Sequence, residues 1–303
     1  MLSKFIQQNN LSESFFTTAN QYYLPLANKL ALKCQQKMDV KDCSPYFVGV
    51  NGCQGSGKST LVEFLALYLK DQFNLSVVVL SLDDFYLNQD KRQQLAADIH
   101  PLFKYRGVPA THDTKLLKKV LLQLKDVNSV GHVNEIIRLP RFDKAQDNPL
   151  AKQYWPNVTS KVDIVLLEGW CWGVPAQIQQ DLHLAINDLE TEQDPLVIWR
   201  EYANEALQND YQPLYPLMDL WLMLKAPSFN VVYQWRLEQE QKLAQATIAS
   251  NKVNKVMDTQ ALNKFIQLFQ RLTEHGLKEL PDKVDILFEL DQSRKIIASR
   301  GID

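Results

Sequence analysis

The chain has 303 residues, of which 46% are hydrophobic and 22% are charged, and its formal net charge is −2 at pH 7. This composition is ordinary for a soluble protein with a sizeable core, and it provides no positive field that would attract nucleic acid or an anionic membrane. No apolar stretch approaches the roughly 20 residues that span a bilayer, and the start "MLSKFIQQNNLSESFF" lacks the apolar core of a secretory signal. The four cysteines show neither the paired spacing of a metal site nor the pattern of a disulfide framework. We therefore expect a cytoplasmic location.

Residues 1–45 are predicted to form an N-terminal helical extension, because apolar residues recur at helical spacing from Phe5 to Ala31. From residue 46 the pattern changes to short β-branched runs that alternate with long helical stretches. The predicted strands are "YFVGV" (46–50), "SVVVLSL" (76–82), "DIVLLEG" (163–169), "DLWLMLKA" (219–226) and "VDILFEL" (284–290). Residues 231–280 are predicted to form two long helices, with Gly276 ending the second.

Near-continuous apolar runs are typical of strands that are covered on both faces, as in parallel sheets. Strands that alternate with helices favour right-handed βαβ units. We therefore predict an α/β fold with a doubly wound, mainly parallel sheet, formed by residues 46–303 as one domain. The composition indicates nothing about the oligomeric state.

The stretch "GCQGSGKST" fits the phosphate-loop pattern, since four residues separate Gly52 from Gly57-Lys58-Ser59. A predicted strand leads into it and an amphipathic helix leads out. The glycines let backbone N–H groups turn inward as an anion nest at the positive end of the helix dipole. We expect Lys58 to reach the β- and γ-phosphates of a nucleoside triphosphate and the Ser59 hydroxyl to bind Mg²⁺. The predicted nucleotide-binding residues are Gly52, Cys53, Gln54, Gly55, Ser56, Gly57, Lys58, Ser59 and Thr60.

A second metal ligand is expected from "DIVLLEGW", an apolar strand that ends in an acidic residue. The metal partner at such a position is usually an aspartate. Here the acid at the strand end is Glu168, whereas Asp163 precedes the strand and is the weaker candidate. Beside an intact phosphate loop, Glu168 is predicted to bind Mg²⁺ directly or through water; an ordinary acid that follows a strand is the alternative.

The segment "LDDFY" follows Lys58 by one βαβ crossover, and the sequence has no N-K-x-D guanine motif and no transporter signature. This arrangement resembles the uridine kinase, phosphoribulokinase and pantothenate kinase group. There, an aspartate at this strand end, followed two positions later by phenylalanine, is the base for the acceptor hydroxyl. The resemblance implies that Asp83 is the base, which orients the hydroxyl and takes its proton late. Asp84 is expected to hydrogen-bond within the loop or to lie in the outer shell of the metal.

Further segments narrow the resemblance. "HPLFKYRGVPATHD", "LPRFDKAQDN" and "YQWRLEQEQKL" together resemble the D-glycerate 3-kinase family of plants and fungi, and the likeness runs from about residue 45 to the C-terminus. It implies a P-loop NTPase fold, ATP and Mg²⁺ as cofactors, and phosphorylation of the primary hydroxyl of D-glycerate to 3-phosphoglycerate. It also implies that the closing "LFELDQSR" forms the last strand and a loop over the adenine.

Two departures from the family pattern concern the acceptor. Ala110 stands where family members usually carry glycine, and "AQDNPLAKQYWP" replaces a loop that contains Gly-Asp-Arg. Other acceptors, such as pantothenate or a nucleoside, therefore stay open. A non-catalytic ATP-binding regulator is the alternative from another class; it would have no need of Asp83 and a basic pocket.

Basic residues fall in two clusters that suit a small anionic acceptor, because an arginine fork holds a carboxylate in a fixed orientation. Lys104 and Arg138 fit a solvated basic face equally well. Asp113 is expected to cap a helix, whereas Arg106 and His112 bracket the turn "GVPAT". The predicted acceptor-binding residues are Arg106, His112, Arg141 and Lys144.

Arg236 begins a charged helix in "YQWRLEQEQ" that suits a helical lid. A lid over both substrates would exclude water, which would otherwise waste the triphosphate. Arg236 would then neutralise the transferring phosphoryl group. Alternatively, Arg236 forms an ion pair with Glu240, which lies one helical turn later. The predicted catalytic residues are Lys58, Asp83 and Arg236.

Overall fold

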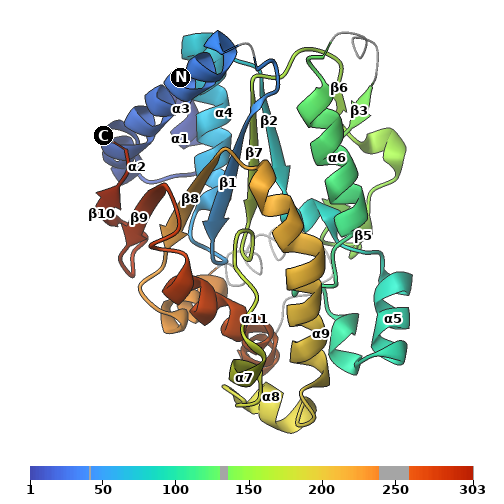
Figure 1. Ribbon diagram of the computed structural model, residues 1–303. Helices are drawn as coiled ribbons and strands as arrows, with labels where there is room; N and C mark the ends of the chain where they lie inside the picture. The colour runs from blue at the N-terminus through green and yellow to red at the C-terminus, as the bar shows by residue number, and fades with distance from the viewer. Residues whose placement is uncertain (41, 130–135, 239–258, 303) are drawn as a thin grey trace, which may run out of the picture.

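The computed structural model describes residues 1–40, 42–129, 136–238 and 259–302. Its centre is a six-stranded sheet with the order β10-β9-β8-β1-β7-β2 (Figure 1). The strands are β1 (Tyr46–Gly52), β2 (Val77–Ser81), β7 (Ile164–Gly169), β8 (Leu220–Lys225), β9 (Ile286–Leu290) and β10 (Ile296–Arg300). The pairs β2–β7, β7–β1, β1–β8 and β8–β9 are parallel, whereas β10 pairs antiparallel with β9. The predicted α/β class and all five predicted strands are confirmed.

The inner strands β1 and β7 are buried along their whole length, as their continuous apolar runs predict. Side chains of β1 alternate between two layers of core. Phe47 packs into the layer that contains Leu121, whereas Val48 packs into the layer that contains Phe64. β1 and β7 are therefore covered on both faces, and polar groups beside them can gather only at the strand ends.

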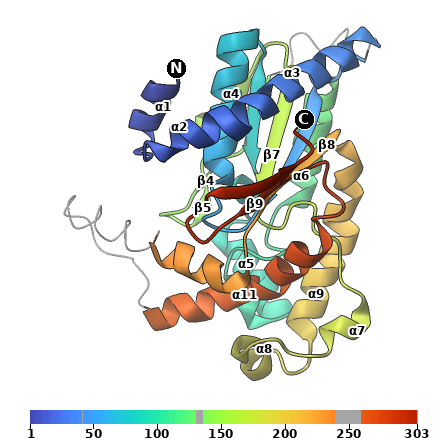
Figure 2. The same ribbon diagram turned by 90° about the vertical axis from the view of Figure 1, so that its left-hand side faces the viewer.

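The helices lie on both sides of the sheet and below its carboxyl edge (Figures 1 and 2). They are α1 (Leu2–Gln8), α2 (Ser14–Thr18), α3 (Leu24–Asp39), α4 (Lys58–Phe73), α5 (Gln89–Asp98), α6 (Thr114–Asp126), α7 (Gln179–Leu182), α8 (Asp188–Gln193), α9 (Ile198–Ala206) and α11 (Thr259–Glu279). Residues 229–238 are also helical. Four short strands, β3 (Ile137–Arg138), β4 (Phe142–Asp143), β5 (Asn148–Pro149) and β6 (Asn157–Val158), form two small hairpin-like pairs.

The N-terminal helices share their core with the sheet. Phe5 and Phe15 pack edge-on against Phe64 of α4, with ring centroids 5.5 and 5.8 Å apart. Leu26 and Leu30 of α3 are fully buried in the same layer. This segment therefore supports α4, the helix that begins at the phosphate loop.

Gly276 does not end its helix as predicted, because α11 continues to Glu279. A Cβ atom at this position would lie 3.1 Å from Cγ2 of Val174. The glycine thus allows a close approach between α11 and the segment after β7, and it is not a stop signal.

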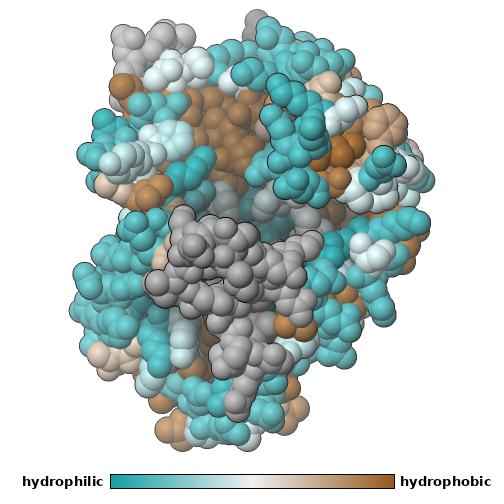
Figure 3. Space-filling view, turned by 180° about the vertical axis from the view of Figure 1, so that it is seen from behind, coloured by the Kyte–Doolittle hydropathy of each residue, from teal (hydrophilic) through white to brown (hydrophobic). Residues whose placement is uncertain are grey.

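From behind, the surface is largely hydrophilic, and apolar side chains gather in a recess of its upper half (Figure 3). Among the described helices, none combines the length and the apolar character that crossing a bilayer requires.

Candidate active site

The phosphate loop connects the end of β1 to the start of α4. Its backbone turns through two left-handed glycines, Gly55 with φ 79° and Gly57 with φ 92°, a conformation that costs other residues free energy. A Cβ atom on Gly52 would lie 2.6 Å from Oγ of Ser56, so a larger residue there would require the Ser56 side chain to move. The first N–H groups of α4 have no partner within the helix, and they face the loop with the positive end of the helix dipole. This is the geometry that cradles phosphate groups. Cys53, which lies in the loop, is buried, and burial raises the pKa of its thiol to about 12, so the thiol stays protonated.

The pairing of β1 with β7 brings Glu168 next to the loop. Ser59 donates its hydroxyl to Oε1 of Glu168 at 3.1 Å, and Nζ of Lys58 lies 3.7 Å from Oε2. Glu168 is only 5% exposed, and Oε2 has no hydrogen-bond partner among the described residues. A buried carboxylate oxygen without such a partner, beside a hydroxyl, fits Mg²⁺, which prefers oxygen ligands.

This pair is a partial metal site by itself. Within the described residues, no group of three or more histidine, cysteine, aspartate or glutamate side chains could hold a metal ion. Mg²⁺ commonly takes one or two protein oxygens and completes its octahedron with water and substrate phosphates. Ser59 and Glu168 match that requirement.

Asp83 lies at the same edge of the sheet, in the turn after β2. Because β2 pairs in parallel with β7, Ser81 is level with Glu168. Oδ2 of Asp83 accepts a hydrogen bond from Nζ of Lys144 at 2.6 Å, and Oδ1 accepts one from the Tyr86 hydroxyl at 3.1 Å. Burial alone would raise the pKa of Asp83, but the charges of Lys144 and Lys58 outweigh it and lower the pKa to about 2. The carboxylate is therefore ionised at neutral pH.

The predicted residues Gln54, Lys58, Asp83, Arg106, Lys144 and Arg236 line one cavity of about 80 Å³. Its remaining walls are Tyr86, Trp170, Phe265 and Phe269. Four cationic side chains surround one carboxylate, so the cavity suits a small anion that carries a group able to hydrogen-bond to Asp83.

Comparisons with known proteins show which family the chain belongs to. No protein-family model matches the chain. The chain is 30% identical over 262 residues to the uncharacterized kinase mug58 of Schizosaccharomyces pombe, covering 84% of this chain and 89% of that protein. It is 27% identical over 271 residues to the chloroplastic D-glycerate 3-kinase of Arabidopsis thaliana, covering 84% of this chain and 56% of that protein. The chain belongs to the D-glycerate 3-kinase family of P-loop kinases.

Two solved structures share the fold of this chain. D-glycerate 3-kinase from Cryptococcus neoformans superposes with a TM-score of 0.75 at 23% identity, covering 92% of this chain and 98% of that one. The YGR205w protein superposes with a TM-score of 0.67 at 23% identity, covering 95% of this chain and 96% of that one. The protein is thus an ATP-dependent kinase of the P-loop class, as the resemblance implied.

Within this kinase site, Arg141 and Asp84 pair with each other outside the cavity. Nη1 of Arg141 donates to Oδ2 of Asp84 at 3.2 Å, and the backbone N–H of Phe142 donates to Oδ1 at 3.0 Å. Asp84 thus anchors the loop that carries Lys144, in agreement with its expected hydrogen-bonding role. Arg141 is not among the residues that line the cavity, and its binding of the acceptor stays a prediction.

His112 also lies outside the lining of this cavity, and its predicted acceptor-binding role stays a prediction. It is 4% exposed, its ring stacks on Tyr86 with centroids 4.3 Å apart, and its Nδ1 shares a hydrogen bond of 2.7 Å with the Tyr211 hydroxyl. Burial lowers the pKa of His112 to about 3, so the ring is neutral. A neutral ring cannot balance an anion; its contacts instead support Tyr86, which holds Asp83. The neighbouring Asp113 caps α6 as predicted, accepting a hydrogen bond from the N–H of Leu116 at 2.9 Å.

Sequence reasoning missed the residue that anchors Arg106. Asp147 accepts a hydrogen bond from Arg106 through Oδ1 and a second, of 2.7 Å, from Arg92 through Oδ2. Arg92 is itself only 1% exposed. Although burial opposes ionisation, hydrogen bonds from the two arginines lower the pKa of Asp147. The only signal in the sequence was the departure of the loop "AQDNPL" from the family pattern.

Arg236 reaches the cavity from the helix at 229–238, and its guanidinium lies over the Phe265 ring, 5.9 Å from the centroid. Glu240, its alternative partner, lies outside the described residues. The position of Arg236 beside Lys58 and Asp83 agrees with a role near the transferring phosphoryl group.

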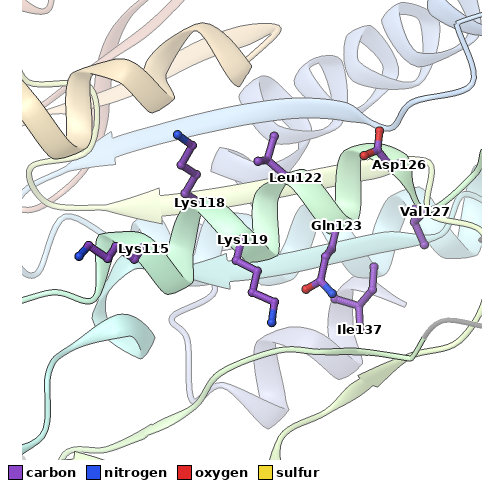
Figure 4. A pocket seen from close by; sticks show the side chains of 8 residues that line it. All are labelled: Lys115, Lys118, Lys119, Leu122, Gln123, Asp126, Val127 and Ile137. Atoms are coloured by element: carbon purple, nitrogen blue, oxygen red, sulfur yellow. The ribbon is translucent and has the colours of Figure 1, made fainter.

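A second cavity, of about 420 Å³, runs along α6 (Figure 4). Its lining includes Lys115, Lys118 and Lys119, but their side chains point in different directions and do not converge. None of the predicted site residues lines it. This cavity therefore lacks the convergence of charged side chains that is found at the edge of the sheet.

Proposed function

We propose that the protein transfers the γ-phosphate of ATP to the primary hydroxyl of D-glycerate, giving 3-phosphoglycerate and ADP. The observation that carries this proposal is the small cavity in which four cationic side chains surround Asp83, directly beside the phosphate loop. A relative whose name states D-glycerate 3-kinase activity supports the choice of acceptor.

ATP would lie on residues 52–60, with Lys58 on its β- and γ-phosphates. Ser59 and Glu168 would hold Mg²⁺, which would neutralise negative charge on the phosphates of ATP. These two side chains already contact each other through a hydrogen bond of 3.1 Å, so little rearrangement is needed to present their oxygens together.

Asp83 acts on the acceptor hydroxyl. A carboxylate with a pKa of about 2 is a weak base, and it suits a reaction in which the hydroxyl loses its proton late. The hydroxyl oxygen forms a bond to the γ-phosphorus, while the bond from that phosphorus to the β–γ bridging oxygen breaks and ADP leaves. The proton passes to Asp83 and then to solvent.

The carboxylate of the acceptor is assigned to Arg106, Lys144 and Arg236. Arg106 is held in place by Asp147, and such a fixed guanidinium can orient a carboxylate. Lys144 is 62% exposed and long, so it can contact both Asp83 and the acceptor.

The test is an ADP-release assay of the purified protein with D-glycerate, L-glycerate, pantothenate and uridine. D-glycerate is expected to stimulate ADP release most strongly. Preference for pantothenate or uridine would instead support a kinase of the same fold with another acceptor. ATP binding without stimulation by any of the four would support a non-catalytic regulator.

A further inference from the structure

The loop between β9 and β10 holds Arg294 in a constrained conformation. Arg294 has φ 68°, a left-handed value that residues other than glycine rarely adopt. The loop is closed by Asp291, whose Oδ1 accepts hydrogen bonds from the N–H groups of Ser293 at 2.8 Å and Lys295 at 2.9 Å. The backbone therefore projects the Arg294 side chain in one direction.

That side chain contacts two separate elements. Nε donates to the carbonyl oxygen of Gly55 in the phosphate loop at 2.8 Å, and Nη2 donates to Oε2 of Glu238 at 2.7 Å. The guanidinium also lies over the ring of Trp235, 5.0 Å from its centroid. Glu238 and Trp235 both belong to the helix at 229–238, so one residue joins this helix to the nucleotide loop.

The same helix carries Arg236 to the acceptor cavity. Trp235 is only 1% exposed, and its Nε1 donates a hydrogen bond of 2.7 Å to the carbonyl oxygen of Gln292. This is a second bond between the helix at 229–238 and the loop between β9 and β10. The exposed ion pair of Arg294 with Glu238 contributes little alone, since the two side chains are 31% and 48% exposed. The bond to Gly55 is what makes the position of the helix depend on the phosphate loop.

We propose that Arg294 is a positioning residue that couples the nucleotide loop to the helix at 229–238, so that a bound triphosphate secures Arg236 at the acceptor cavity. An arginine is required, because its planar fork can bond two acceptors at once, whereas a lysine ammonium cannot reproduce that geometry. Phosphates that order the loop also order the Gly55 carbonyl, and the coupling is reciprocal by linkage. The inference rests on ATP binding and not on the identity of the acceptor.

The test is hydrogen–deuterium exchange of the amides at 229–238, with and without the Mg²⁺ complex of a non-hydrolysable ATP analogue and with no acceptor present. In the unchanged protein, the analogue is expected to slow exchange at least about fivefold, the lower end of usual coupling. Arg294→Ala should reduce that factor to below about twofold, and Arg294→Lys should give an intermediate factor.

Two further variants keep the test decisive. Arg294→Gly removes the side chain while relieving the left-handed backbone, so it should lose coupling as Arg294→Ala does, even if the alanine variant folds poorly. Arg300→Ala is the matched control, because Arg300 lies on the same hairpin but donates to the carbonyl oxygens of Pro281 and Val284. The proposal would be overturned if the analogue slowed amide exchange at 229–238 equally in Arg294→Gly and in the unchanged protein. It would also be overturned if the analogue bound the unchanged protein but did not slow exchange there.

Discussion

The substitution Asp83→Asn removes the proposed base with little change in shape. The amide oxygen can still accept the hydrogen bond that the Tyr86 hydroxyl donates at 3.1 Å. Lys144 loses its partner at 2.6 Å, but its side chain is 62% exposed and stays solvated. Because folding lowers the pKa of Asp83 from 3.8 to about 2, the ionised carboxylate stabilises the fold, and the free energy of unfolding should fall by up to about 2 kcal/mol.

The catalytic effect should be much larger. Positioned general bases contribute about 100- to 10,000-fold to the rate, or roughly 2.7 to 5.4 kcal/mol of transition-state stabilisation. ATP binding should be unchanged or slightly tighter, because the variant removes a negative charge near Lys58 and the phosphate site.

The assay compares single-turnover ADP formation with ATP affinity measured by calorimetry. Asp84→Asn is the matched control, because Asp84 has the same chemistry one residue away but bonds Arg141 and the Phe142 backbone. It should lose less than about tenfold in rate. If Asp83→Asn turned over within tenfold of the unchanged protein, the assignment of the base would be refuted.

Four further outcomes follow from the same geometry. Tyr86→Phe removes one hydrogen bond to Asp83 and should lower kcat about 10- to 100-fold with the KM for ATP unchanged, as steady-state kinetics would report. Glu168→Gln should weaken Mg²⁺ activation about 10- to 100-fold in a metal titration, and ATP binding without metal should persist. Because the pKa of Asp83 falls from an ordinary 3.8 to about 2, protonation of Asp83 should not reduce the activity between pH 5 and 8. Lys144→Ala raises that pKa, so in a pH–rate profile the loss of activity at low pH should begin at a higher pH than in the unchanged protein. Gly107→Ala would place a Cβ atom 2.5 Å from an aromatic ring of the cavity wall, so thermal unfolding should show a loss of about 1–3 kcal/mol and the KM for the acceptor should rise.

The central sheet was predictable because its strands are local signals. Buried parallel strands need continuous apolar runs, and all five such runs form strands within two residues of the predicted ends. β10 was missed, since four of its five residues are exposed and no apolar run marks it. Gly276 was misinterpreted because the reason for a glycine there is Val174, about a hundred positions earlier in the chain.

The site was predictable where residues follow strand ends. Lys58, Asp83 and Glu168 come together because β2, β7 and β1 are parallel neighbours, and the motif spacing locates each strand end. The bonds that organise the acceptor side are between distant residues, such as Arg92 with Asp147. Nothing local in the sequence indicates that His112 is buried and neutral or that Arg141 is paired.

The most direct test of the account is the ratio of kcat/KM for D-glycerate to that for glycerol, which has the hydroxyl but no carboxylate. Hydrogen bonds to charged groups contribute about 1.5–3 kcal/mol each, and 1.4 kcal/mol corresponds to a factor of ten. With two or more cations of the cavity on the carboxylate, the ratio should be at least about 100. A ratio near one would contradict the assignment of the cavity to an anionic acceptor.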